Sequence, residues 1–235
     1  LPVIFASSQI SKSAQSKWGK NPSLAKQIFS TPSLILAVDD EQKNRFRQLA
    51  NIGGCNSKPK ILNIGSLKND YSVNSSNFSY EKALKKFAKN SKSIIILAAS
   101  THENEEALIA NAILKISNSD QFLTIFAPRH SYRAKEIITQ LGAMPRRSKS
   151  ELPMFENPYF LSDSLGEMMS LYNVADIIIL GGSFFYSGGH NPIEPALAGK
   201  QIICGQSIFK NKSDYEELID IGMIRQIKSN DTLHN

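Results

Sequence analysis

The chain has 235 residues, of which 41% are hydrophobic and 20% charged, a composition typical of globular proteins with enough apolar material for a core. Its 27 Lys and Arg against 21 Asp and Glu give a formal net charge of +6. This excess favours anionic partners and equally fits a solvated basic surface. The lysines are scattered, with a mild cluster on one expected helix, and no nucleic-acid-binding motif occurs, so we expect no nucleic-acid partner.

Cysteine content and the chain's opening restrict the class of protein further. Cys55 and Cys204 fit no metal-binding spacing and no disulfide framework, which favours a reducing compartment. No apolar run approaches the roughly 18–20 residues of a membrane-spanning helix. The opening Leu1-Pro2-Val3-Ile4-Phe5 is typical of a strand and lacks the charged start of a signal peptide. We therefore expect a chain that begins inside a longer protein.

The expected elements divide into two groups. In the first, strands are expected at 3–6, 34–38 and 61–64, and helices at 23–29 and from 39 or 40 to about 50. Residues 69–79, rich in Ser and Asn, predict a linker. The second group is more regular, with helices expected at 80–90, 103–117, 131–141, 164–173, 192–198 and 212–221, strands at 93–98, 122–127, 176–180 and 201–204, and a loop at 143–163. This alternation predicts an α/β fold with a doubly wound parallel sheet.

Residues 181–195, Gly-Gly-Ser-Phe-Phe-Tyr-Ser-Gly-Gly-His-Asn-Pro-Ile-Glu-Pro, follow an apolar strand. Glycines at a strand end allow the backbone to approach a ligand closely. Asn191 is a good helix N-cap and Pro192 a good first helical residue, and a helix N-terminus favours an anionic ligand. The Glu194 carboxylate is placed to accept hydrogen bonds from sugar hydroxyls. The segment therefore predicts a nucleotide-sugar site.

Other polar segments also follow expected strands. They are Ser100-Thr101-His102, Pro128-Arg129-His130 and Gly205-Gln206. Because ligands in doubly wound sheets bind beyond the carboxyl ends of the strands, these segments and the one at 181–195 predict one shared crevice.

Each of these segments also has a purely structural interpretation. Ser100 with Glu103, Ser164 with Glu167, and Asn191 with Glu194 have the spacing of helix caps. Arg129 fits an ion pair with a neighbouring carboxylate as well as bidentate hydrogen bonding to a phosphate. Arg133, one turn later, is expected at the surface.

The pattern G-G-S-x5-G-G-H-N-P-x-E-P at 181–195 resembles the signature of the 3-deoxy-D-manno-octulosonic acid (Kdo) transferases. Three further blocks match in the same order: Ala98-Ala99-Ser100-Thr101-His102-Glu103, Pro128-Arg129-His130 and Asp163-Ser164-Leu165-Gly166-Glu167. Gly65-Ser66-Leu67-Lys68 is similar to the family's G-N-L-K. These glycosyltransferases move Kdo from CMP-Kdo onto lipid A precursors during lipopolysaccharide biosynthesis.

The resemblance implies a GT-B fold, with two Rossmann-like domains. Residues 1–75 would be the remainder of the N-terminal acceptor-side domain, and residues 76–235 most of the C-terminal CMP-Kdo-binding domain. It also implies a place at the cytoplasmic face of the bacterial inner membrane, with membrane contact through parts of the protein not in this chain. The implied partners are the CMP-Kdo donor and a lipid A precursor acceptor.

The resemblance further implies the residues of the donor site. CMP would be held by Pro128, Arg129, Ser164, Leu165, Gly166, Asn191, Pro192, Ile193 and Glu194. Among these, Arg129 would grip the phosphate, the backbone at Gly166 would lie against the base, and Glu194 would hold the ribose hydroxyls. Contacts with the donor sugar are implied for Ser100, Thr101, His102, Gly182, Ser183, Gly189 and His190. No cofactor or metal is expected, and no Asp-x-Asp motif occurs.

The first part of the chain departs from the family. The family's N-A-R-x-S-x-R-S stretch aligns with residues 7–14, where Gln9 and Ser13 replace the arginines. The family's catalytic base, a glutamate near the start of the full protein, matches no residue here. Two alternatives therefore stay open: another GT-B enzyme that uses a UDP-sugar, and a catalytically silent donor domain that binds or stabilises a partner. The number of Kdo units, the acceptor details and the oligomeric state do not follow from the sequence.

Overall fold

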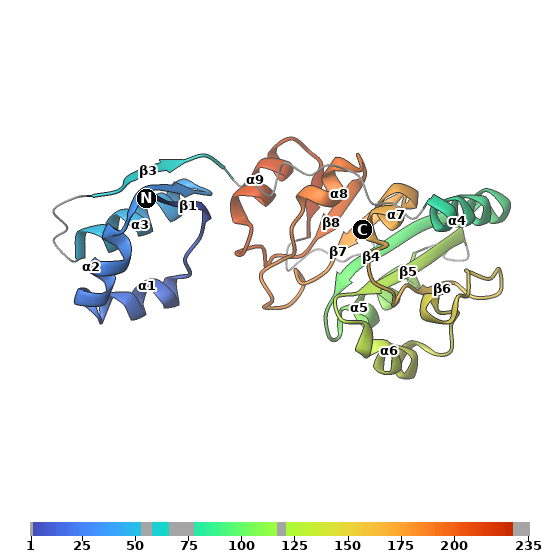
Figure 1. The fold of residues 1–235 in the computed structure, drawn as a ribbon. Coiled ribbons are helices and arrows are strands. Elements are labelled where there is room, and N and C mark those ends of the chain that lie inside the picture. The colour runs from blue at the N-terminus through green and yellow to red at the C-terminus, as the bar shows by residue number, and fades with distance from the viewer. Residues whose placement is uncertain (1, 53–57, 66–77, 117–120, 228–235) are drawn as a thin grey trace. The chain divides into compact units, whose positions relative to one another are not determined.

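The computed structural model describes residues 2–52, 58–65, 78–116 and 121–227 (Figure 1). The chain divides into two units, Leu1–Ser72 and Val73–Asn235. The expected domain boundary at 75 and the block at Gly65-Ser66-Leu67-Lys68 fall wholly or mostly within residues 66–77, outside the described residues. Because helix α4 begins at Phe78, the last two residues of the expected linker are helical.

The first unit has a three-stranded parallel sheet in the order β1-β2-β3, formed by Val3–Ser8, Pro32–Ala37 and Lys60–Asn63. Three helices accompany it: α1 Lys12–Gly19, α2 Pro22–Ser30 and α3 Asp40–Ile52. Phe29, Ile35, Phe46 and Leu49 lie in its core. Helix α1 was not predicted, because none of its residues is buried and it therefore shows no apolar period.

The second unit has a six-stranded parallel sheet in the order β6-β5-β4-β7-β8-β9. The strands are β4 Ile94–Thr101, β5 Phe122–Pro128, β6 Tyr159–Leu161, β7 Ile177–Leu180, β8 Gln201–Cys204 and β9 Ile224–Gln226. The chain runs outward from β4 to β6 and then returns beside β4 at β7. This reversal between β4 and β7 is the topological switch point, where doubly wound sheets bind their ligands.

Helices cover both faces of this sheet (Figure 1). They are α4 Phe78–Ser91, α5 Glu105–Ile113, α6 Ala134–Leu141, α7 Met168–Val174, α8 Ile193–Leu197 and α9 Lys212–Asp220. Ile95 and Leu97 of β4 pack in one core with residues of α4, α7 and α9. The alternate residue Ile96 packs in a second core with residues of α5 and α6. The predicted doubly wound α/β fold is confirmed.

Some predicted boundaries were wrong. Strands β6 and β9 have three residues each, too few for a recognisable period, and β6 lies inside the expected loop 143–163. The helix expected from 103 begins at Glu105, and the helix expected from 164 begins at Met168. A short 3-10 helix at Ser131–Arg133 precedes α6, and another lies at Arg147–Lys149.

Candidate functional site

A cavity of about 220 Å³ lies at the carboxyl edge of the second unit's sheet. Its lining comes from the ends of β4 and β5, the segment after β6, and helices α7 and α8. It brings together Ser100 and most of the residues expected to hold CMP, namely Pro128, Arg129, Ser164, Leu165, Gly166 and Glu194. Asn191, Pro192 and Ile193, also expected there, do not line it. Segments from four distant parts of the chain thus share one hollow, while their binding role remains a prediction.

Arg129 is the cationic residue of this lining. Its backbone N–H donates to the carbonyl oxygen of Thr101 at 3.0 Å, which ties the end of β5 to the end of β4. Its side chain is exposed, and no carboxylate among the described residues pairs with it. The guanidinium is therefore available to an anion, and the structural alternative of an ion pair does not apply within the described residues.

The segment after β6 is held in place by partly buried ion pairs. The Glu167 carboxylate accepts from Arg147 Nη2 at 2.6 Å and from the Ser164 hydroxyl. Arg147 also lies 4.2 Å from the centre of the Tyr80 ring. Asp163 accepts from Arg146 Nη2 at 2.7 Å. The capping interpretation of Ser164 was wrong, because α7 begins only at Met168.

Gly166 has a positive φ of 80°, and a Cβ added there would meet nothing within 4 Å. The glycine is therefore required by the backbone conformation, which L side chains rarely adopt. Beside it, the Leu165 side chain is 84% exposed at the rim of the cavity. An exposed apolar side chain at this rim offers a surface for a flat ring.

The loop after β4 also differs from the capping interpretation. Ser100 lies inside β4 with a φ of 54°, and α5 follows Asn104, whose φ is 68°. Ser100 lines the cavity. Thr101 is fully buried and its hydroxyl donates to Glu106 at 2.6 Å, so this hydroxyl is occupied within the protein. Ser100 lies where the pairing of β4 with β5 shifts in register between Ala99 and Thr101, and Asn104 is the N-cap of α5.

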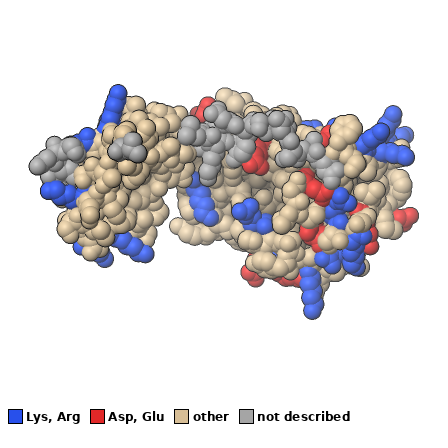
Figure 2. All heavy atoms as spheres, viewed as in Figure 1, with Lys and Arg blue, Asp and Glu red and all other residues tan. Residues whose placement is uncertain are grey.

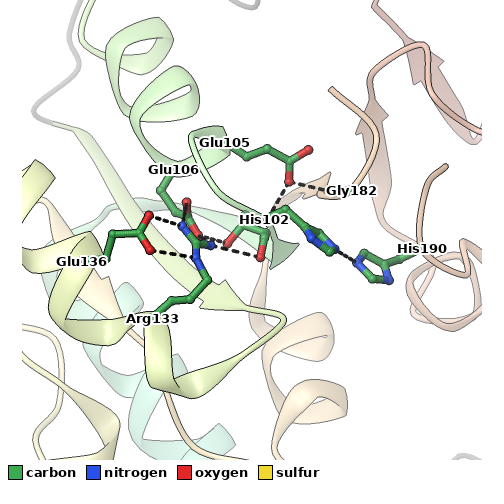
Figure 3. Close-up of polar contacts among 8 residues, drawn as sticks. His102, Glu105, Glu106, Arg133, Glu136, Gly182 and His190 are labelled. Carbon is green, nitrogen blue, oxygen red and sulfur yellow. Dashed lines mark hydrogen bonds and ion pairs between the residues drawn. The ribbon is translucent and has the colours of Figure 1, made fainter. Parts of the chain in front are cut away.

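His102 and His190 lie against each other, with their Nε2 atoms 2.8 Å apart (Figure 3). Burial lowers the pKa of His102. The pKa of His190 is lowered to about 4, mainly by burial and then by the charges of His102 and Arg129. Both rings are therefore neutral at pH 7, and one donates its proton to the other. A neutral pair of this kind offers further N–H and N atoms to a sugar.

Glu105 is a residue that the sequence reasoning missed (Figure 3). It is fully buried, and its carboxylate accepts from three backbone N–H groups: Gly182 at 2.7 Å, His102 at 2.9 Å and Phe184 at 3.1 Å. It therefore joins the loop after β4 to the loop after β7. A carboxylate at the start of an otherwise apolar helix was the available signal, but it also fits an ordinary acidic first turn.

Arg133 was expected at the surface, and this was wrong. Its side chain is 7% exposed and pairs with Glu106, which is fully buried, through two contacts of 2.7 and 3.1 Å. Glu136 accepts from the same guanidinium at 2.9 Å (Figure 3). This cluster joins the start of α5, which carries Glu106, to the 3-10 helix and α6, which carry Arg133 and Glu136. It thereby helps to fix the loop between β4 and α5.

The glycines at 181–189 also have a structural explanation, and close approach of a ligand to them stays a prediction. A Cβ on Gly181 would lie 2.6 Å from Thr101 Cα, one on Gly188 would lie 2.8 Å from the Phe209 ring, and one on Gly189 would lie 3.0 Å from the Tyr215 ring. A Cβ on Gly182 would lie 2.9 Å from His190. These glycines are required by close packing of the protein on itself, so close approach of a ligand is not needed to explain them.

Two expected donor-sugar contacts are occupied internally. Ser183 is fully buried; its hydroxyl donates to the Leu180 carbonyl at 2.5 Å and accepts from Gly205 N at 2.8 Å. Gly189 is buried, and its N–H donates to the Gly182 carbonyl at 2.7 Å. Of the residues expected to contact the sugar, Ser100, His102 and His190 are partly exposed.

The helix after residue 191 is shorter than predicted. Pro192 occupies the N-cap position of α8, which has five residues. Asn191 Oδ1 accepts from Ile193 N at 3.1 Å. Asn191 therefore binds the first residue of α8, but from the position before the N-cap. The dipole of so short a helix is a weak contribution to anion binding.

The His190 pKa predicts a pH dependence of stability. The unfolded imidazole titrates near pH 6.5, so between pH 6.5 and 4 the unfolded chain binds a proton that the folded chain does not. Stability therefore falls as pH falls, by about 1 kcal/mol from pH 7 to 5 once partial exposure is taken into account. Chemical denaturation at both values measures this, and His190→Gln should reduce the difference. An equal difference in the variant would contradict the assignment.

Among the described residues, no helix is both long enough and apolar enough to cross a bilayer.

Comparisons with known proteins agree with the motifs. No protein-family model matches the chain. It is 28% identical over 234 residues to the 3-deoxy-D-manno-octulosonic acid transferase of Haemophilus influenzae, which covers 97% of this chain and 53% of the relative. It is 30% identical over 231 residues to the same-named protein of Bordetella pertussis, with 94% and 52% covered. The chain thus spans about half the length of the curated relatives it matches.

A solved structure agrees with these matches. The C-terminal CMP-Kdo binding domain of WaaA from Acinetobacter baumannii aligns with a TM-score of 0.58 and 25% identity, over 67% of this chain and 85% of that one. Together with the two parallel sheets, this match supports the expected GT-B type of fold. The resemblance read from the motifs is confirmed, and the chain is a relative of the Kdo transferases along nearly its whole length.

Proposed function

We propose that this chain is part of a Kdo transferase and carries the site for the CMP-Kdo donor. The enzyme would move Kdo onto a lipid A precursor in lipopolysaccharide biosynthesis, at the cytoplasmic face of the inner membrane. The observation that carries the proposal is the cavity in the second unit, where Arg129, Gly166 and Glu194 meet at the carboxyl edge of the sheet. The domain of similar structure is named for binding the same donor. Residues 1–75 would then belong to the acceptor-side domain.

The lining suits the parts of CMP. Arg129 would pair with the phosphate, Glu194 would accept from the ribose hydroxyls, and the rim at Leu165 would contact the base. Ser100, His102 and His190 would face the sugar. These roles are supported by the shared cavity, by the free guanidinium within the described residues, and by the neutral histidine pair.

In the proposed reaction, a hydroxyl of the acceptor attacks the anomeric carbon of Kdo. The bond from that carbon to the phosphate oxygen breaks, and CMP leaves with the electron pair. Negative charge grows on the phosphate as the bond breaks, so a fixed cation such as Arg129 stabilises the transition state. The base that takes the hydroxyl proton would come from outside this chain.

Calorimetry with CMP tests the proposal. We expect CMP to bind the chain and Arg129→Ala to weaken binding about 10- to 100-fold, because a hydrogen-bonded charge pair is lost. Glu194→Ala should weaken it about tenfold, through loss of the contacts to ribose. The matched control is Arg225→Ala, an exposed arginine of β9 outside the cavity lining.

Two outcomes would contradict the proposal. No heat with CMP and an intact fold would remove the donor site, and tighter binding of UDP than of CMP would favour a different GT-B enzyme. The silent alternative is supported by Gln9 and Ser13 in place of the family's arginines. CMP binding without turnover by the full-length protein would establish that alternative.

A further inference from the structure

Aromatic rings, rather than charges, mark a further surface on the second unit. On the face shown in Figure 2, Lys and Arg side chains gather in several separate places, and Asp and Glu side chains lie between them. The rings are more sharply grouped. Tyr132, His130, His102 and His190 form a continuous row at the carboxyl edge of the sheet, and we call this set the ring row.

The ring row consists of two stacked pairs. The rings of Tyr132 and His130 lie 5.3 Å apart with 15° between their planes, and those of His102 and His190 lie 5.0 Å apart at 17°. His130 meets His102 edge to face, with ring centres 6.3 Å apart. Tyr132 is 80% exposed and His130 is also exposed, whereas His102 and His190 are partly buried. The row therefore leads from solvent to the neutral histidine pair.

The backbone holds the outer pair, Tyr132 and His130, from both ends. The N–H of Arg129 donates to the end of β4 at 3.0 Å, and the N–H of Arg133 donates to the His130 carbonyl at 3.1 Å. Arg133 is itself fixed by its ion pair with the buried Glu106 (Figure 3). Because the rings are already held in place, a ligand that binds them has little ordering cost to overcome.

The outer pair and the cavity proposed for CMP lie on different sides of the sheet edge. Helices α7 and α8, which contribute to the cavity, pack on the core that contains Ile95. The 3-10 helix with Tyr132 leads into α6, which packs in the core that contains Ile96, on the other face. Arg129 lies between them, since it lines the cavity and directly precedes His130. A donor held by its phosphate at Arg129 would therefore have the ring row beyond that phosphate.

We propose that the outer pair is a platform for a sugar ring of the acceptor. The inference rests on the proposed function and extends it, since it gives the donor-binding unit a second site next to the transferred sugar. With the nucleotide on the side of α7 and α8, the acceptor hydroxyl would reach the anomeric carbon from the side of the ring row. One face of a pyranose ring presents C–H groups, which fit the negative face of an aromatic ring such as that of Tyr132.

The surroundings of the outer pair suit a sugar better than an acyl chain. Within residues 129–135, Tyr132 is the exposed large hydrophobic residue, so the apolar area matches one small ring and not a long chain. The Tyr132 hydroxyl and the His130 ring nitrogens can also donate to and accept from sugar hydroxyls. A nucleotide base would stack on the same ring, and the measurements below distinguish it from a sugar.

Kinetics of the full-length protein test the proposal. Tyr132→Ala should raise the KM for the acceptor about tenfold and leave kcat and the KM for the donor nearly unchanged, because stacking away from the reacting atoms is equal in the ground and transition states. Tyr132→Phe keeps the ring and should stay near the parent value. The matched control is Tyr186→Ala, since Tyr186 is 90% exposed and its ring lies 5.1 Å from that of Phe209, outside the ring row.

Binding to the chain itself separates this inference from the proposed function. Saturation-transfer NMR with a deacylated lipid A saccharide, in the presence of CMP, should show binding by the parent, Tyr132→Phe and Tyr186→Ala, and about tenfold weaker binding by Tyr132→Ala. Calorimetry should give all four the same affinity for CMP. Since the side chain is exposed, equal CMP affinity also shows that the variants are folded.

The possible failures differ between the two proposals. No CMP binding by the parent would contradict the proposed function, whatever the saccharide does. Normal CMP binding, together with no saccharide binding by the parent or with equal saccharide affinities in Tyr132→Ala and Tyr186→Ala, would overturn the platform alone. A larger effect of Tyr132→Ala on CMP than on the saccharide would also overturn it, because the ring would then hold the base.

Discussion

Replacement of Arg133 by methionine is expected to lower the free energy of unfolding by about 3–5 kcal/mol. The reason is the charge that would remain. Glu106 is fully buried, and its carboxylate accepts from the Thr101 hydroxyl and, through two contacts, from this guanidinium. Without Arg133, the carboxylate must stay buried and unpaired or take up a proton. Urea denaturation of the parent and of Arg133→Met measures the loss.

The matched control is Glu136→Gln, which removes the other carboxylate of the cluster. Glu136 has a side chain that is 39% exposed, so its pair with Arg133 should contribute less than about 1 kcal/mol. A double variant, Arg133→Met with Glu106→Gln, should recover part of the loss because the buried charge is gone. If Arg133→Met unfolds at the parent's urea concentration, the cluster does not support the fold as described.

Replacement of Glu105 by alanine is the second change with a large expected effect. It would leave the backbone N–H groups of His102, Gly182 and Phe184 without their acceptor in a buried place. At about 1–3 kcal/mol for each unsatisfied group, with some relaxation and entry of water, we expect a loss of about 3–5 kcal/mol. Chemical denaturation gives the total. Hydrogen exchange at Gly182 and Phe184 should accelerate more than exchange in the core strands.

Glu103→Ala is the control, since Glu103 is an exposed acidic residue of the same loop. It should change stability by less than about 0.5 kcal/mol. Glu105→Gln should be intermediate, because an amide keeps one acceptor oxygen but turns an NH₂ group towards an N–H donor. CMP binding should weaken in Glu105→Ala, because the loop that follows the end of β4, where Ser100 lines the cavity, loses its tie to the loop after β7. Unchanged exchange at Gly182 would contradict this role.

The sequence predicted elements that bury a continuous or periodic set of apolar side chains. Strand β4, for example, was recognisable because residues such as Ile95 and Ile96 fill the cores on its two faces. Prediction from the sequence failed where an element buries too few side chains, as in α1, or is too short to show an apolar period, as in β6 and β9. The cap patterns failed for another reason: the same spacing of Ser and Glu also occurs in loops, and at Ser164 the hydroxyl binds a side chain instead of a helix start.

By itself, the sequence determined the parallel doubly wound sheet, the likeness to Kdo transferases, and the strand ends that meet around Arg129, because each depends on local pattern and chain order. Only the tertiary structure decided which polar residues are structural. Glu105 binds a backbone group 77 residues away, and Arg133 binds a carboxylate 27 residues away. Such contacts have no local signature, since burial of a charge becomes tolerable only when distant parts of the chain supply its partners. The glycines of 181–189 follow the same rule, because the atoms that exclude their side chains belong to other segments.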